Sequence, residues 1–155
     1  MTTETIERDE VHAFTIRKEI EIAAPIEIAF AAVLDELGAD AQMPDGKSLS
    51  MKIEPWPGGR WYRDLGDNAG HLWGHVQVIK PPTLLEITGP MPMSYPAVNH
   101  VQYRLKEEGG KTRLTFAHRA MGLILPEHRD GMPEGWQHWL EQIRERAERD
   151  AHETR

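Results

Sequence analysis

Residues 97–120, "AVNHVQYRLKEEGGKTRLTFAHRA", constrain the fold most, because they predict a β-hairpin whose register is fixed. Apolar or aromatic side chains alternate with polar ones on both sides of the glycine pair: Val101, Tyr103 and Leu105 before it, and Leu114, Phe116 and His118 after it. A tight turn at Gly109-Gly110 pairs Tyr103 with Phe116 and Val101 with His118. The hairpin therefore predicts one inner face that carries His118, with His100 on the outer face.

The rest of the chain contains patterns for five further strands and for two helices. Alternation predicts strands over 14–22, 49–54, 61–65, 71–80 and 83–88, and helical spacing predicts helices over 25–37 and over 132–155, the latter frayed at its end. The order is a strand, a helix, six strands in succession and a long helix, which indicates an antiparallel α+β domain. We expect a flexible arm over 1–12, a single domain over 13–150 and a frayed end over 151–155.

Composition narrows the class of protein. The chain has 155 residues, no cysteine and a formal net charge of −7. These features predict one domain without disulfides or thiolate metal sites, and they argue against nucleic acid as a partner. No apolar run is long enough for a membrane span and the first residues are acidic, so we expect no membrane insertion and a cytoplasmic protein.

Four segments in sequence carry a resemblance to a known family: "PWPGGRWY", "GHVQVIKPPTLLEIT", "VQYRLKEEGGKTRLTFAHRAMG" and "EGWQHWLEQI". From about Phe14 to Arg149 the chain resembles the START-like, or SRPBCC, superfamily, within the group related to the C-terminal domain of the activator of the heat-shock protein 90 ATPase. The resemblance implies a helix-grip fold, in which a curved antiparallel sheet of about seven strands wraps the C-terminal helix around a cavity. Family members include lipid carriers, ring-closing enzymes and co-chaperones, so the fold does not select the function.

The segment "WPGGRWY" has two interpretations. A phosphate-binding loop would open onto a helix N-terminus, whereas these glycines precede a strand, which favours a turn. A turn of Pro57-Gly58 alone pairs Ile53 with Tyr62 and turns Tyr62 and Asp64 inward. Addition of Gly59 to the turn pairs Ile53 with Arg63 and Met51 with Leu65. We prefer the longer turn, because it buries Trp61 and Leu65 and brings Arg63 to the inner side.

The inner face and the last helix supply the candidate ligand-binding residues. These are Trp61, Arg63, Met91, Met93, Tyr103, Phe116, His118, Trp136 and Trp139. Each aromatic member is equally compatible with an ordinary core position, and Met91 and Met93 fit either a pliable lip or the core. An apolar lining with a few polar groups is the usual makeup of a small-molecule site, which favours a pocket.

No pattern predicts a catalytic nucleophile, a metal site or a cofactor. His71 and His75 would lie about 13 Å apart on a strand, which is too far for one ion. No serine lies in a Gly-x-Ser-x-Gly turn, and the expected inner positions carry almost no carboxylates. Acid–base chemistry by Tyr103 with His118 is the remaining catalytic interpretation.

Three functions follow. The first is non-enzymatic binding of a small apolar or aromatic ligand, lipid-like or polyketide-like, which Arg63, Tyr103 and His118 would orient. The second, implied by the resemblance, is a protein-interaction module that stimulates a chaperone ATPase of the heat-shock protein 90 family. The third is a cyclase- or aromatase-like enzyme that uses Tyr103 and His118. We expect a monomer, or a homodimer joined through an exposed edge strand.

Overall fold

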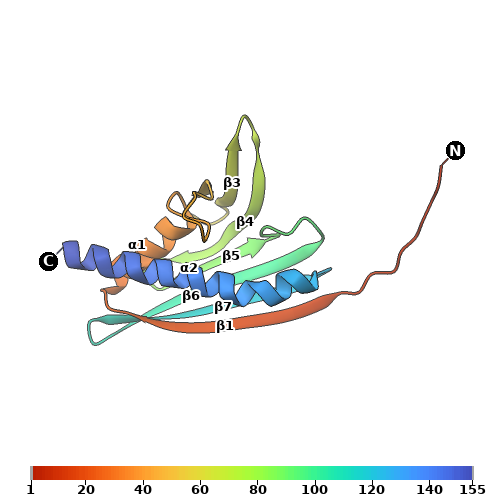
Figure 1. Cartoon of the computed structure of the whole chain (residues 1–155). Coiled ribbons are helices and arrows are strands. Elements are labelled where there is room, and N and C mark those ends of the chain that lie inside the picture. Colours follow the sequence, from red (N-terminus) through yellow and green to blue (C-terminus); the bar gives the residue numbers. More distant parts are fainter. Residues whose placement is uncertain (1, 155) are drawn as a thin grey trace.

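The helices and strands follow the predicted order in a computed structural model, which describes residues 2–154 (Figure 1). Their bounds are β1 (His12–Ile22), α1 (Ile26–Leu37), β2 (Met51–Ile53), β3 (Arg60–Gly66), β4 (Ala69–Lys80), β5 (Leu84–Gly89), β6 (Ala97–Glu108), β7 (Lys111–Gly122) and α2 (Pro126–Glu153). Neither helix is long and apolar enough, within these residues, to cross a membrane.

All the strands belong to one antiparallel sheet, and α2 lies across it. The strand order is β1-β7-β6-β5-β4-β3-β2 in a 7-stranded sheet. The sheet curves along the length of α2, with α1 against the same helix near its C-terminal end (Figure 1). This is the helix-grip α+β architecture that the sequence predicts.

The β6–β7 hairpin has the predicted register. Tyr103 pairs with Phe116, and Val101 pairs with His118. His118 is fully buried on the face toward α2, whereas His100 lies on the outer face, where its Nε2 is 2.8 Å from Glu86 Oε1. The alternation of side chains was therefore sufficient to orient this part of the sheet.

Helix α2 begins earlier than predicted. It begins at Pro126 rather than at Met132, and it continues to Glu153. Its buried face consists of Trp136, Leu140, Ile143, Ala147 and Ala151. Ala151 is buried because α1 packs beside the last turns of α2. Residues 2–11 contain no helix or strand, while residues 1 and 155 of the two expected flexible ends lie outside the described residues.

The first four residues of "WPGGRWY" lie in a loop between β2 and β3 and the last three begin β3, but neither predicted turn length is right. Met51 pairs with Arg63 and Ile53 with Trp61, so residues 55–59 form the connection. Gly58 has a φ of 84°, which favours glycine, and a Cβ at Gly59 would collide with the carbonyl oxygen of Glu54. The Gly58 amide donates to Val76 O and the Gly59 amide to Trp56 O, so neither is free to bind a phosphate.

The β3–β4 hairpin projects away from the two layers (Figure 1). The expectation that Leu65 is buried is therefore wrong, because this side chain is 59% exposed near the tip of the hairpin. Trp61, at the base of the same strand, is fully buried as expected. Strand β3 thus enters the core only at its Trp61 end. Buried and exposed side chains do not alternate strictly along the part of β3 that α1 and α2 leave uncovered.

Candidate functional site

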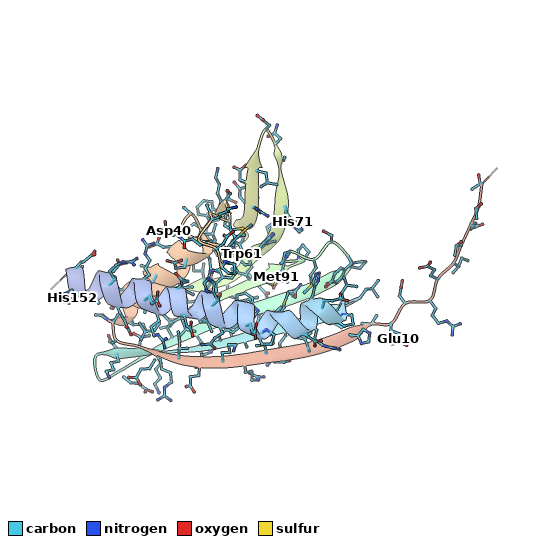
Figure 2. The ribbon with its side chains drawn as sticks, viewed as in Figure 1. Glu10, Asp40, Trp61, His71, Met91 and His152 are labelled. Carbon is cyan, nitrogen blue, oxygen red and sulfur yellow. The ribbon has the colours of Figure 1, made fainter. Side chains whose placement is uncertain are left out.

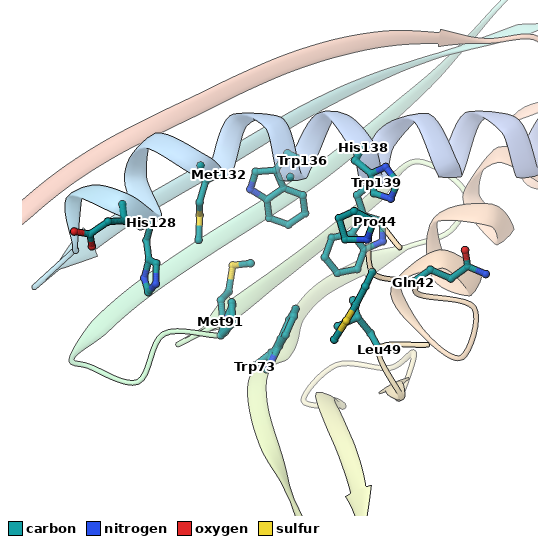
Figure 3. A pocket seen from close by; sticks show the side chains of 15 residues that line it. Gln42, Pro44, Leu49, Trp73, Met91, His128, Met132, Trp136, His138 and Trp139 are labelled. Carbon is teal, nitrogen blue, oxygen red and sulfur yellow. The ribbon is translucent and has the colours of Figure 1, made fainter. Parts of the chain in front are cut away.

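A cavity of about 410 Å³ lies between α2 and the loops at one end of the sheet. Its volume falls within the range of small-molecule sites, about 300–1,000 Å³. Its walls come from the α1–β2 loop, β4, the β5–β6 loop and the first half of α2 (Figure 3). The lining consists of Gln42, Met43, Pro44, Leu49, Trp73, Met91, Pro92, Glu127, His128, Gly131, Met132, Gly135, Trp136, His138 and Trp139.

Tryptophan rings form one wall of the cavity. The rings of Trp136 and Trp139 stack at a centroid distance of 5.5 Å and an angle of 22°. Trp73 meets Trp139 edge to face at 6.3 Å, and its Nε1 has no hydrogen-bond partner within residues 2–154. This wall presents apolar aromatic surface to the cavity, while the Trp73 Nε1 is buried within the wall.

The tryptophan wall is fixed to the end of α1. The indole of Trp139 donates to Glu36 O at 2.7 Å, and the indole of Trp61 donates to Leu37 O at 2.8 Å. These carbonyl groups belong to the last turn of α1, where no intrahelical donor is available. Trp61 is fully buried and packs against Trp73 and Trp139 at centroid distances of 5.1 and 5.9 Å, so it supports the wall from the core side. Figure 2 shows Trp61 at the base of the β3–β4 hairpin.

Glycines hollow the surface of α2 at the cavity. Gly131 and Gly135 are one turn apart on the helix, and both line the cavity. A Cβ built at either position meets no atom within 4 Å, so the space in front of them is open. Glycine inside a helix destabilises it by about 1 kcal/mol relative to alanine. This pair therefore lowers the stability of α2, unless a bound molecule fills the space in front of it.

Met91 faces the cavity from the β5–β6 loop, and Met132 faces it from α2. Figure 3 shows the two side chains pointing toward each other from opposite sides. Met91 has a φ of 55°, and its amide donates to Trp73 O at 2.8 Å, which ties the loop to β4. Met93 is outside the cavity lining and packs with Ala120 and Ile124.

His128 joins the β5–β6 loop to the start of α2. Its Nδ1 lies 2.7 Å from the hydroxyl oxygen of Tyr95, and the two rings stack at 5.5 Å. The Leu125 amide donates to the same hydroxyl oxygen at 3.5 Å. Because the Tyr95 oxygen accepts that bond, its own proton is free to be donated to His128 Nδ1. The contact holds one side of the cavity in place.

His118 is a hydrogen-bonded core histidine. The Trp136 indole donates to His118 Nδ1 at 2.9 Å, and His118 Nε2 donates to Asn99 Oδ1 at 2.7 Å. Burial lowers the pKa of His118 to about 4, so the imidazole is neutral near pH 7. Both ring nitrogens are occupied, and His118 does not line the cavity.

Tyr103 and Phe116 also lie in the core rather than at the cavity. Their rings meet edge to face at 5.2 Å, and both residues are fully buried. The Tyr103 hydroxyl has no hydrogen-bond partner within residues 2–154, and burial raises its pKa well above the usual range. Neither residue lines the cavity, so a ligand bound there does not contact them.

Arg63 is not a polar anchor for this cavity. Its Nε donates to Leu49 O at 3.1 Å, which ties β3 to the loop before β2. The residue borders a different hollow, of about 640 Å³, along the β3–β4 hairpin. That hollow is formed mostly by exposed polar residues and glycines of one hairpin, and no second layer covers it. We therefore take the tryptophan-lined cavity as the candidate site.

The family can now be assigned. Residues 23–148 match the family described as activator of Hsp90 ATPase homolog 1-like protein. The chain belongs to this family. It is accordingly a member of the START-like, or SRPBCC, superfamily, as the sequence motifs indicated.

Solved structures of related proteins share the helix-grip fold. An uncharacterized protein from Rhizobium leguminosarum is 18% identical, with a TM-score of 0.72, and the match covers 92% of this chain and 99% of that one. The AHSA1-like protein of Rhizobium etli is 28% identical, with a TM-score of 0.58 and coverage of 92% and 86%. CalU16 from Micromonospora echinospora is 20% identical, with a TM-score of 0.61 and coverage of 88% and 81%. No curated protein matches the chain.

Of the candidate residues in this AHSA1-like chain, the structure brings Met91, Trp136 and Trp139 together at the cavity. Trp61, Arg63, Met93, Tyr103, Phe116 and His118 lie outside its lining. Sequence reasoning missed the other lining residues, among them Trp73, His128 and the helix glycines. The signal for Gly131 and Gly135 was present, because glycines four residues apart share one face of a helix.

Proposed function

We propose that the protein binds a small apolar or aromatic ligand in the cavity between α2 and the loops at the end of the sheet. The observation that supports this most is the pair Gly131 and Gly135. They leave open space in front of a helix that would be more stable with alanine at both positions. A ligand that fills this space would offset the cost.

The wall chemistry supports an aromatic ligand. Trp139 is partly exposed and supplies contact area to a flat ring system, while Trp73 and Trp136 are 7% and 4% exposed and contribute less. Aromatic pairs contribute about 0.5–1.5 kcal/mol beyond the area that they bury. Met91 and Met132 can adjust to the outline of such a ligand, because methionine has flexible side-chain torsions.

The geometry gives less support to the enzyme interpretation based on Tyr103 and His118. A catalytic group must come within hydrogen-bond distance of the reacting atoms, about 3 Å. Both nitrogens of His118 are engaged, and the Tyr103 hydroxyl is fully buried away from the cavity. Stimulation of a chaperone ATPase is supported by the family name, and no surface feature of the described residues adds to that support.

The test is a fluorescence titration with N-phenyl-1-naphthylamine, an uncharged aromatic dye that becomes bright in apolar sites. We expect a dissociation constant of about 1–100 μM for a ligand of this size. Gly135→Phe places a ring in the open space and should abolish binding. Glu134→Phe is the matched control, because Glu134 is exposed on the same turn and does not line the cavity.

Each variant is first checked for native circular dichroism. Binding that is lost in Gly135→Phe and kept in Glu134→Phe supports the proposed site. Equal binding by both folded variants would place the dye elsewhere, and no binding by the unsubstituted protein would refute the proposal for aromatic ligands of this size.

A further inference from the structure

The charge of the cavity wall carries an inference about the ligand, which rests on the function proposed above. We propose that the cavity selects uncharged or cationic aromatic ligands and disfavours ligands that carry a carboxylate or sulfonate. Among the described lining residues there is no lysine or arginine, and the formally charged residue is Glu127. An anionic group bound in the cavity would have no lysine or arginine of the lining to pair with, and it would share the cavity with the Glu127 carboxylate.

Arg63, Arg129 and Lys47 each contact an acceptor of the protein itself. The Nε of Arg63 donates to Leu49 O at 3.1 Å, on the β3 side of the loop. The Nε of Arg129 is 3.0 Å from Asp130 Oδ1 and belongs to an exposed pair. Lys47 is 4.0 Å from Asp45 Oδ2, and 81% of its side chain is exposed. None of these groups lines the cavity.

The N-terminus of α2 borders the cavity and would ordinarily favour an anion. Here most of the amide groups that would bind an anion are absent or already hydrogen-bonded within the protein. Pro126 has no amide proton, and the amides of His128 and Arg129 both donate to Leu125 O at 3.1 Å. Glu127 supplies a negative charge in the same first turn. A carboxylate ligand would therefore compete with Glu127 for the favourable end of the helix dipole.

The tryptophan wall favours the opposite charge. The face of an indole ring carries partial negative charge, so it attracts cations and repels anions. Trp136 and Trp139 lie stacked along α2, and Trp73 meets Trp139 edge to face across the cavity wall. Together with Glu127, the exposed indole surface favours a neutral or cationic ligand, and the basic side chains among the described lining residues are those of His128 and His138.

The experiment compares two dyes with the same ring system. N-phenyl-1-naphthylamine is uncharged, and 1-anilinonaphthalene-8-sulfonate adds one sulfonate to it. Both are titrated at pH 8, where free histidine is neutral. We expect the uncharged dye to bind at least tenfold more tightly. Glu127→Lys should reduce this preference by at least threefold, because it replaces the negative group at the cavity by a positive one.

The control is Glu153→Lys, which makes the same change in net charge. Glu153 is exposed at the end of α2, about 21 Å along the helix from the lining residue Trp139, well beyond the screening length of about 8–10 Å at physiological salt. It should leave the preference unchanged. Equal or tighter binding of the sulfonate dye by the unsubstituted protein would overturn the inference, as would an equal effect of the two lysine variants. If neither dye binds, the proposed function itself fails.

Discussion

The indole Nε1 of Trp136 donates a hydrogen bond of 2.9 Å to Nδ1 of His118. Trp136 also lines the cavity, so this bond links the cavity wall on α2 to the buried face of β7. His118 in turn donates to Asn99 on β6. A short chain of buried polar groups thus sets the position of one cavity ring relative to the sheet.

Replacement of His118 by leucine should destabilise the fold. The Nε1 of Trp136 and the Oδ1 of Asn99 would both lose their partner in the core. We expect the free energy of unfolding to fall by about 2–4 kcal/mol, because each orphaned buried group costs about 1–3 kcal/mol. Urea unfolding of His118→Leu measures this loss.

A double-mutant cycle checks the cause of that loss. Trp136→Phe removes the donor that His118→Leu leaves unpaired, so the double variant should lose less than the sum of the two single variants. Strict additivity would mean that the Trp136–His118 bond contributes little and that the leucine variant fails through packing alone.

The same histidine should make stability depend on pH. Burial lowers its pKa in the folded state to about 4, compared with about 6.5 in the unfolded chain. Between these values the unfolded chain binds a proton that the folded protein does not, so the free energy of unfolding rises with pH. This residue contributes a rise of up to about 3 kcal/mol between pH 4 and 6.5.

Urea unfolding of the original protein and of His118→Gln across this range isolates the contribution. The glutamine variant does not titrate at this position, so its free energy of unfolding should change less between pH 4 and 6.5. Parallel curves for the two proteins would contradict a neutral, buried His118.

The Tyr103 hydroxyl should be dispensable for stability. It is buried without a hydrogen-bond partner within residues 2–154, a state that costs free energy. Tyr103→Phe should therefore unfold at the same free energy or at up to about 2 kcal/mol more. A loss of more than about 1 kcal/mol in calorimetry or urea unfolding would show that the hydroxyl has a partner, such as an internal water.

Gly135→Ala should raise stability. Alanine favours the helix by about 1 kcal/mol over glycine, and the added Cβ meets no atom within 4 Å. For a chain of this size the midpoint of thermal unfolding should rise by about 2–4 °C. Glu134→Ala is the control and should change the midpoint by less, since both residues are good helix formers. A lower midpoint for Gly135→Ala would mean that the helix is strained at this position.

Local alternation and helical spacing were enough to predict the order of the elements. The register of β6 and β7 followed from the two-residue period around Gly109-Gly110, because one buried face fixes both strands. The buried stripe from Trp136 to Ile143 followed from the helical period in the same way. Both patterns depend on residues close together in the chain.

The site was predicted only in part, because its walls come from segments that no local pattern connects. Gly131 has low helix propensity and directly precedes the predicted helix, so the turns of α2 before Met132 were missed, and with them His128 and part of the cavity. The loop over 55–59 is longer than either turn considered, and β3 leaves the core beyond Trp61. Tertiary packing decides these features.

The central claim is that an aromatic ligand binds against the tryptophan wall, and indole resonances test it most directly. The chain has five tryptophans, and each gives one ¹H–¹⁵N indole signal. Trp73, Trp136 and Trp139 line the cavity, whereas Trp56 is 54% exposed outside its lining. Addition of N-phenyl-1-naphthylamine should shift the three cavity signals and leave Trp56 unchanged. If the dye binds while those three signals stay in place, the ligand site is not this cavity.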